Sequence, residues 1–136
     1  MRDYITTSNL YWGYFVLDKL KQMPFKDSET SKCTVVKGDL LVCEGGDVGQ
    51  AAIWGFDNPI CIQNHIHRLR SYVAVQILFY YYVFMLYKNI GIIGGKGIGI
   101  QGLSSNALHN LIIPLPPIQE QQRIVDKIEQ LFQLLK

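Results

Sequence analysis

Three prolines lie within residues 114–117, and they constrain the fold of this chain more than any other feature. Proline lacks a backbone N–H and fixes φ, so this segment cannot continue a sheet or lie inside a helix. Pro117 is well placed to open a helix, and a helical pattern runs from Ile118 to the C-terminus. The chain therefore divides into a domain over 1–113, a proline hinge over 114–117 and a helical arm over 118–136.

The arm carries an apolar stripe on one side. The stripe repeats at spacings of 4, 3 and 4, which is typical of a coiled-coil seam. Left alone, such a seam would face water, so the pattern predicts self-association through the arm. The residues of this seam are Ile124, Ile128, Leu131 and Leu135.

The pattern of the first 113 residues predicts a mixed α/β (α+β) domain, which we call the head. With 49% apolar and 18% charged residues, the chain of 136 residues can bury a core without disulfides. Short strands are expected over 4–7, 34–36, 40–43 and 111–113, with 40–43 and 51–54 forming a hairpin around a glycine-rich turn. We expect a twisted, largely antiparallel sheet with a few helices, followed by the coiled-coil-type helix.

Two longer segments complete the head. Residues 60–70 alternate, which predicts one half-buried strand with Cys61, Gln63, His65 and His67 on its polar face. The apolar run Val73–Tyr87 is shorter than the ~18–20 residues that a membrane span needs, so a helix buried in the core is expected. Ser71 would cap this helix, while Asn89 and Gly91 would end it.

The segment Gly97–Gly102 spells G-x-G-x-x-G, the fingerprint of a dinucleotide-binding loop. That motif requires a preceding strand and a following crossover helix, but Pro114 comes too soon for the helix and second strand. Lys96 is followed by glycine, which excludes a P-loop. A flexible surface loop remains, as does a glycine-lined loop that approaches phosphates closely.

No pattern for catalysis or metal binding is complete. Cys61, His65 and His67 would lie about 7 Å apart along a strand, which is too far for one ion without a bend. There is no G-x-S-x-G nucleophile motif and no cysteine with a local catalytic signature. The sequence therefore predicts a non-enzymatic chain that binds neither a metal nor a cofactor.

The polar residues suit binding. A net charge of +2 permits contact with nucleic acid without requiring it, and Arg68, Arg70 and Lys96 could neutralise phosphates. Three cysteines, an odd number, with no signal peptide at the N-terminus favour reduced thiols in a cytoplasmic protein with no membrane partner.

A family resemblance becomes specific at the C-terminal end. Leu103-Ser104, followed by Leu111–Val125 with its proline cluster and Glu120-Gln121, closely resembles the signature of type I restriction–modification specificity subunits. Weaker matches occur in order at Tyr4–Ser8, Val36–Val42 and Ile62–Arg70. The resemblance covers essentially the whole chain, although the family has several tens of residues before the segment that begins at Tyr4. It therefore implies one target recognition domain, lacking its first strand, and the start of the conserved helix.

This resemblance implies a function. Such subunits recognise double-stranded DNA without catalysis and dock on two partners. A methylation subunit transfers a methyl group from S-adenosylmethionine to adenine, and a restriction subunit translocates and cuts DNA. The alternative is an interaction or decoy fragment that occupies the methylation subunit without reading DNA.

Under this interpretation, seven residues are candidates for DNA contact. Hydroxyl, amide and imidazole groups can read base edges, and a lysine can bind a phosphate. The candidates are Tyr4, Thr7, Gln63, His65, Lys96, Gln101 and Ser104.

Overall fold

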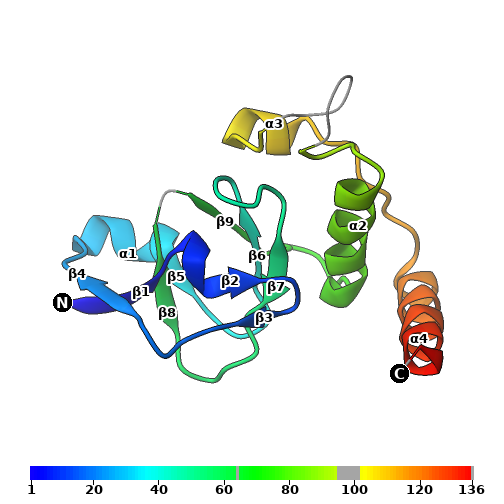
Figure 1. Ribbon diagram of the computed structural model, residues 1–136, viewed down its shortest axis with the longest axis horizontal. Coiled ribbons are helices and arrows are strands. Elements are labelled where there is room, and N and C mark those ends of the chain that lie inside the picture. The colour runs from blue at the N-terminus through cyan, green and yellow to red at the C-terminus, as the bar shows by residue number, and fades with distance from the viewer. Residues whose placement is uncertain (64, 95–101, 136) are drawn as a thin grey trace.

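The computed structural model describes residues 1–63, 65–94 and 102–135 (Figure 1). Its helices are η1 (Thr7–Asn9, a 3-10 turn), α1 (Asp27–Cys33), α2 (Ile77–Asn89), α3 (Ser105–His109) and α4 (Ile118–Leu134). Its strands are β1 (Arg2–Ile5), β2 (Leu10–Tyr11), β3 (Tyr14–Phe15), β4 (Lys21–Met23), β5 (Thr34–Val35), β6 (Leu40–Cys43), β7 (Ala51–Ile53), β8 (Ile60–Ile62) and β9 (Ile66–Leu69).

The strands form three small sheets. One has the order β4-β1-β8-β5, in which β1 and β8 run parallel and the other pairs antiparallel. The second is antiparallel with the order β7-β6-β9, and β2 with β3 forms a hairpin. The predicted mixed α/β class with mostly antiparallel pairing and a C-terminal helix is confirmed, although the strands are divided among separate sheets.

Strand β6 separates two hydrophobic cores. Successive side chains of a strand point to opposite faces, and all four residues of β6 are completely buried. Leu40 and Val42 pack in the core that includes α2, whereas Leu41 and Cys43 pack in the core around Trp54. Burial on both faces explains why this strand is continuously apolar rather than alternating.

The predicted hairpin of β6 and β7 is confirmed. Leu40 pairs with Ile53 and Val42 with Ala51, and the glycine-rich turn joins the two strands. Gly49 has a φ of +86°, a conformation that side-chain-bearing residues rarely adopt. Its N–H donates to the carbonyl of Cys43 at 2.9 Å, which closes the turn.

The prediction of one strand over 60–70 was wrong. The chain turns after Ile62, where the N–H of Ile66 donates to the carbonyl of Gln63 at 3.3 Å, and then enters a different sheet. Cys61 is buried because β8 lies between β1 and β5, so it is not on a polar face. Alternation alone could not locate this break, because both strands keep the same period.

Two other local predictions were wrong. Helix α2 starts six residues beyond Ser71, at Ile77, because the side chain of Gln76 accepts from the N–H of Leu78 and caps it there. Residues 111–113 form no strand, and the carbonyls of Ile112 and Pro114 instead accept hydrogen bonds from the hydroxyls of Tyr87 and Tyr80 at 2.6 and 3.0 Å. The predicted end of α2 is confirmed, with Asn89 its last residue and Gly91 at a φ of +83°.

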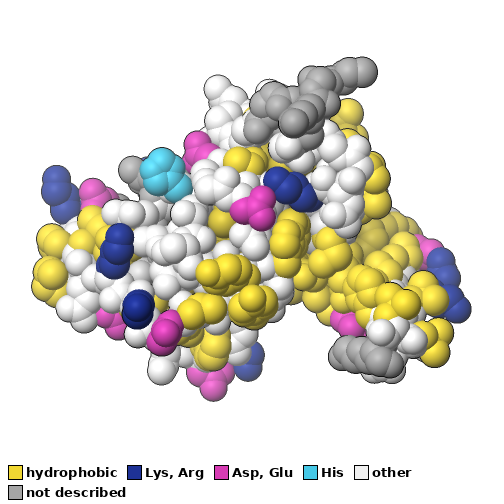
Figure 2. Space-filling view, in the orientation of Figure 1, with side chains coloured by type: hydrophobic (Ala, Val, Ile, Leu, Met, Phe, Trp, Pro, Cys, Tyr) yellow, Lys and Arg dark blue, Asp and Glu magenta, His cyan; other side chains and the backbone are white. Residues whose placement is uncertain are grey.

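Helix α4 begins at Ile118, as Pro117 predicted, and packs against α2 (Figure 1). Val125 is buried against α2, and Ile124 and Ile128 of the predicted seam are half-buried. Leu131 and Leu135 are 52% and 81% exposed. Figure 2 shows hydrophobic side chains gathered over this end of the molecule, at the lower right.

Candidate nucleic-acid interface

Several polar loops meet along one edge of the head, at the top of the sheets in Figure 1. Because β1 and β8 are parallel with Ile5 opposite Ile62, the segments after them, which begin at Thr6 and Gln63, leave the sheet side by side. The N–H of Glu44 donates to the carbonyl of His65 at 2.8 Å, joining the β6–β7 turn to the start of β9. We call the surface formed by Thr7, Gln63, His65, Ser104 and turn 44–49 the polar edge.

The hydroxyl-rich turn at η1 has a fixed conformation. Asn9 is 5% exposed, and its Oδ1 accepts from the N–H of Thr6 at 3.0 Å while its Nδ2 donates to the carbonyl of Val16 at 2.9 Å. The Oγ atoms of Thr6 and Ser8 lie 2.7 Å apart. Buried Asn9 thus holds Thr7 and Ser8 in place at the surface. Thr6 and Ser8 were missed as candidates, although the run of hydroxyl residues was the signal.

Four of the seven candidate residues lie on the polar edge. Thr7 is half-buried beside Gly46, and His65 lies against Gly45. Gln63 is exposed, with its Nε2 lying 3.4 Å from Sδ of Met23. Ser104 is exposed, and its Oγ accepts from the N–H of Ala107 at 3.2 Å, so this hydroxyl caps α3.

The other three candidates differ. Tyr4 is only 8% exposed, and its ring packs edge-on against Phe25 with 6.2 Å between the ring centroids, so it is not part of the polar edge. Lys96 and Gln101 fall in 95–101 and lie outside the described residues, as does most of the glycine loop.

Long-range contacts that sequence reasoning missed hold the polar edge together. Nε2 of His67 donates to the carbonyl of Leu103 at 2.6 Å and lies 3.7 Å from Oε2 of Glu44. Lys88 of α2 donates to the carbonyl of Val48 at 2.6 Å and pairs with Asp47 at 3.3 Å. Each contact joins residues far apart in sequence, so no local pattern could predict it.

The chemistry of this edge suits hydrogen bonding more than charge neutralisation. Thr7, Gln63 and Ser104 offer hydroxyl and amide groups, which can donate to and accept from base edges. The carboxylates of Glu44 and Asp47 lie near the turn, and the ammonium of Lys88 is already paired with Asp47. The edge therefore suits reading of bases, while phosphates require cations elsewhere.

The thiol nearest the polar edge is unsuited to nucleophilic chemistry. Cys43 ends β6 just before the turn, and burial raises the pKa of its thiol to about 11. At neutral pH the thiol is protonated, and the thiolate is the reactive form.

Within residues 1–63, 65–94 and 102–135, no cluster of three or more His, Cys, Asp or Glu side chains could hold a metal ion. None of the helices in those ranges combines the length and the apolar character of a membrane span.

The described chain thus combines a mixed α/β fold, a polar edge and a C-terminal helix that begins after Pro117 and packs against α2. The chain belongs to the type I restriction modification DNA specificity domain family, whose model matches residues 3–136. No curated protein matches it.

Two solved structures are similar to this chain. One comes from work on the complex assembly and conformational transition of the type I R-M system. It is 26% identical to this chain with a TM-score of 0.59, and the match covers 75% of this chain and 25% of the solved chain. The HsdS subunit from Thermoanaerobacter tengcongensis shares the fold, with 24% identity and a TM-score of 0.61 over 74% of this chain and 23% of that one. The match thus spans about a quarter of each solved chain.

Proposed function

We propose that this chain recognises a specific double-stranded DNA sequence as the specificity subunit, or half-subunit, of a type I restriction–modification system. The observation that carries the proposal is the family match over residues 3–136. In that role the chain directs an adenine methyltransferase and a restriction subunit to the target.

The polar edge is the surface that we assign to base reading. A major groove presents a distinct pattern of donors and acceptors for each base pair, and short polar side chains on a rigid scaffold can match it. Thr7, Gln63, His65 and Ser104 have suitable groups, and the hydrogen bonds around Asn9 and His67 support a preorganised edge. Lys96 and Gln101, which lie outside the described residues, remain candidates.

The arm is the surface that we assign to assembly. The exposed Leu131 and Leu135 continue the seam beyond the part covered by α2, which supports pairing with a second helix. If two copies pair about a two-fold axis, the target is a palindrome with a fixed gap, because symmetry in the protein is mirrored in the DNA.

The chain itself performs no catalysis in this proposal. The partner methylation subunit uses S-adenosylmethionine, and the partner restriction subunit translocates and cuts DNA. We place the complex in the cytoplasm, in keeping with the three free cysteines.

The test is genome-wide mapping of methylated adenines in cells that carry a cognate methylation subunit, with and without this chain. A gapped motif that appears only with the chain supports sequence reading, and a palindromic motif supports pairing of two copies. If the chain co-purifies with the methylation subunit but no new motif appears, the proposal fails and the decoy fragment is favoured.

A further inference from the structure

A second polar surface lies where β1, α1 and β9 meet, away from the tip of the β6–β7 turn. It is a shallow depression of about 430 Å³. Its polar lining, which within the described chain includes no acidic side chain, consists of three arginines and three hydroxyl residues: Arg2, Arg68, Arg70, Thr30, Ser31 and Thr34. A surface of this composition is suited to an oxyanion.

Arg68 is held rigidly by the end of α1. Its Nη1 donates to the carbonyl of Ser31 at 3.0 Å and to the carbonyl of Thr34 at 2.6 Å. Its Nε and Nη2 groups have no hydrogen-bond partner among the described residues. The guanidinium is therefore preorganised, with donors left for a ligand.

Arg70 is held in a similar way by a buried carboxylate. Its Nε and Nη2 donate to the two oxygens of Asp39 at 2.7 and 2.6 Å, and Asp39 is 2% exposed. Asp39 offsets the charge of Arg70, but Nη1 of this arginine remains available within the described chain. The depression thus keeps the charges of Arg2 and Arg68.

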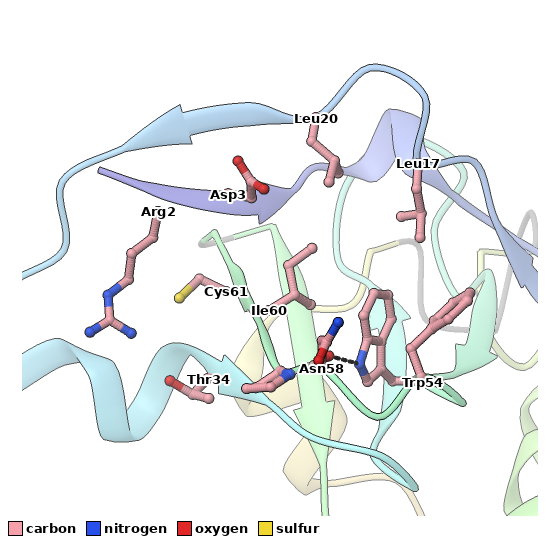
Figure 3. Close-up of a pocket in the computed structure, with 11 residues that line it drawn as sticks. Arg2, Asp3, Leu17, Leu20, Thr34, Trp54, Asn58, Ile60 and Cys61 are labelled. Carbon is pink, nitrogen blue, oxygen red and sulfur yellow. Dashed lines mark hydrogen bonds between the residues drawn. The ribbon is translucent and has the colours of Figure 1, made fainter.

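Arg2 is the third cation of the depression. It lies on β1 with an exposed side chain, and no carboxylate of the described residues lies within 4.0 Å of its guanidinium. Figure 3 shows this side chain extending from β1 toward α1, close to Thr34. An unpaired guanidinium beside a preorganised one can bind phosphate oxygens in bidentate fashion.

The position of the depression fits a duplex that contacts the polar edge. Arg68 follows His65 by three residues, an extended length of about 10 Å at roughly 3.3 Å per residue, and its side chain lies on the other face of β9 from His67. Duplex DNA carries one negative charge per about 1.7 Å of its axis, so phosphates are present within that reach. The polar edge itself carries Glu44 and Asp47, so among the described residues the depression offers the DNA backbone a stronger attraction.

We propose that this arginine-lined depression binds a backbone phosphate of the duplex and orients the head on DNA, an inference that rests on the proposed function. Arg2 is the principal contact, and Arg68 supplies a second, fixed charge. Phosphate contacts carry no sequence information, so this site contributes affinity and register while the polar edge contributes specificity.

The test uses the full chain and a duplex of random sequence, with fluorescence anisotropy between about 50 and 200 mM salt. Each phosphate contact contributes about 0.9 to the slope of log affinity against log salt, so R2Q lowers the slope by about 1. S31E, which places a carboxylate in the depression, lowers the affinity for the duplex more than R2Q does. K127Q, which removes an exposed cation from the arm, leaves the slope unchanged.

The outcomes separate this inference from the proposed function. An unchanged slope for R2Q, or no duplex binding by the wild-type chain, overturns the inference. A parallel titration measures the binding of sodium phosphate to the wild type and to R2Q. If R2Q abolishes phosphate binding but leaves the salt slope of duplex binding unchanged, the assignment of this site to DNA is overturned. A slope that falls with R2Q while no methylated motif appears supports the phosphate site and counts against the proposed function instead.

Discussion

The side-chain oxygen of Gln121, on the arm, accepts a hydrogen bond at 2.9 Å from the backbone N–H of Gln76, the residue that caps α2. The amide nitrogen of Gln121 donates to the carbonyl of Pro116 at 2.9 Å, and the side chain is 1% exposed. One buried amide therefore connects the start of the arm, the proline segment and the start of α2. Because every polar atom of the side chain is paired with a fixed backbone group, the direction of the arm is set at its first turn.

Replacing Gln121 by leucine is expected to destabilise the fold by about 2–4 kcal/mol, because the partners at Gln76 and Pro116 both lose their hydrogen bonds. The free energy of unfolding, measured by urea denaturation, checks this. Q119L is the matched control, since Gln119 is exposed on the same helix and should change stability by less than about 0.5 kcal/mol. Equal effects of the two substitutions would contradict the role of Gln121.

The ion pair of Arg70 with Asp39 should contribute more to stability than the ion pair of Lys37 with Asp57. R70L leaves the carboxylate of Asp39 buried without its cation, and because Arg70 is itself 44% exposed we expect about 2 kcal/mol of destabilisation, below the range for a fully buried pair. K37Q breaks a pair whose side chains are 65% and 90% exposed, so its effect should stay below about 0.5 kcal/mol. Thermal unfolding of both variants at one pH is the measurement, and a K37Q effect as large as that of R70L would refute the distinction.

Removing the hydroxyl of Thr7 should alter DNA recognition without altering the fold. T7V keeps the side-chain shape, and loss of one base contact lowers affinity for the cognate duplex by about 1–3 kcal/mol. Methylation mapping should show relaxed specificity at one position of the motif. S28A, an exposed hydroxyl on α1, is the control and should leave the motif intact. An unchanged motif in T7V would remove Thr7 from the reading surface.

Charges introduced on the exposed half of the seam should abolish self-association. L131K with L135K places two ammonium groups where an apolar helix would pack, and neither leucine is buried in the single chain. Sedimentation velocity should show a mass that rises with concentration for the wild type but not for the variant, with unchanged circular dichroism. If the wild type stays monomeric at every concentration, the assembly role of this seam is wrong.

The thiols of Cys33 and Cys43 should differ in reactivity. Cys43 is completely buried with a pKa of about 11, whereas Cys33 is partly exposed and its pKa is raised, mainly by burial. Iodoacetamide at about pH 8 should therefore label Cys33 first, since the thiolate is the nucleophile. Burial favours the neutral thiol of Cys43. Labelling of Cys43 should therefore increase as the pH rises toward its pKa, because a larger fraction of the thiol is then ionised to the thiolate. Peptide mass spectrometry over time gives both rates, and faster labelling of Cys43 would indicate that the turn opens.

The sequence predicted those features that depend on residues close together in the chain. The hairpin of β6 and β7 follows from two apolar runs around glycines, and the start of α4 follows from Pro117. The break after Ile62 was not predictable in this way, because it depends on which neighbours β8 and β9 pair with. The same limit applies to the capping of α2, which involves Gln121 from 45 positions away.

The candidate site divides along the same line. Gln63 and His65 were chosen from the local alternation over 60–70, and Thr7 and Ser104 from their hydroxyl groups, and all four stay predictions. Tyr4 was chosen from a local strand pattern in the same way. Its burial against Phe25 depends on tertiary packing, which a local pattern does not contain. Arg2 drew no attention in the sequence because its significance depends on Arg68, a residue from another sheet.

The β6–β7 turn projects from the most deeply buried strand of the molecule. The stem is confined by two cores, so almost any change of side-chain volume in it disturbs packing on one side or the other. The tip at Gly46 and Asp47 is exposed and lies outside both cores. A surface tip on a rigid stem can accept substitutions and insertions that its support cannot. Within this framework a new DNA preference could arise by exchanging a few residues of the tip, while the head beneath it remains unchanged.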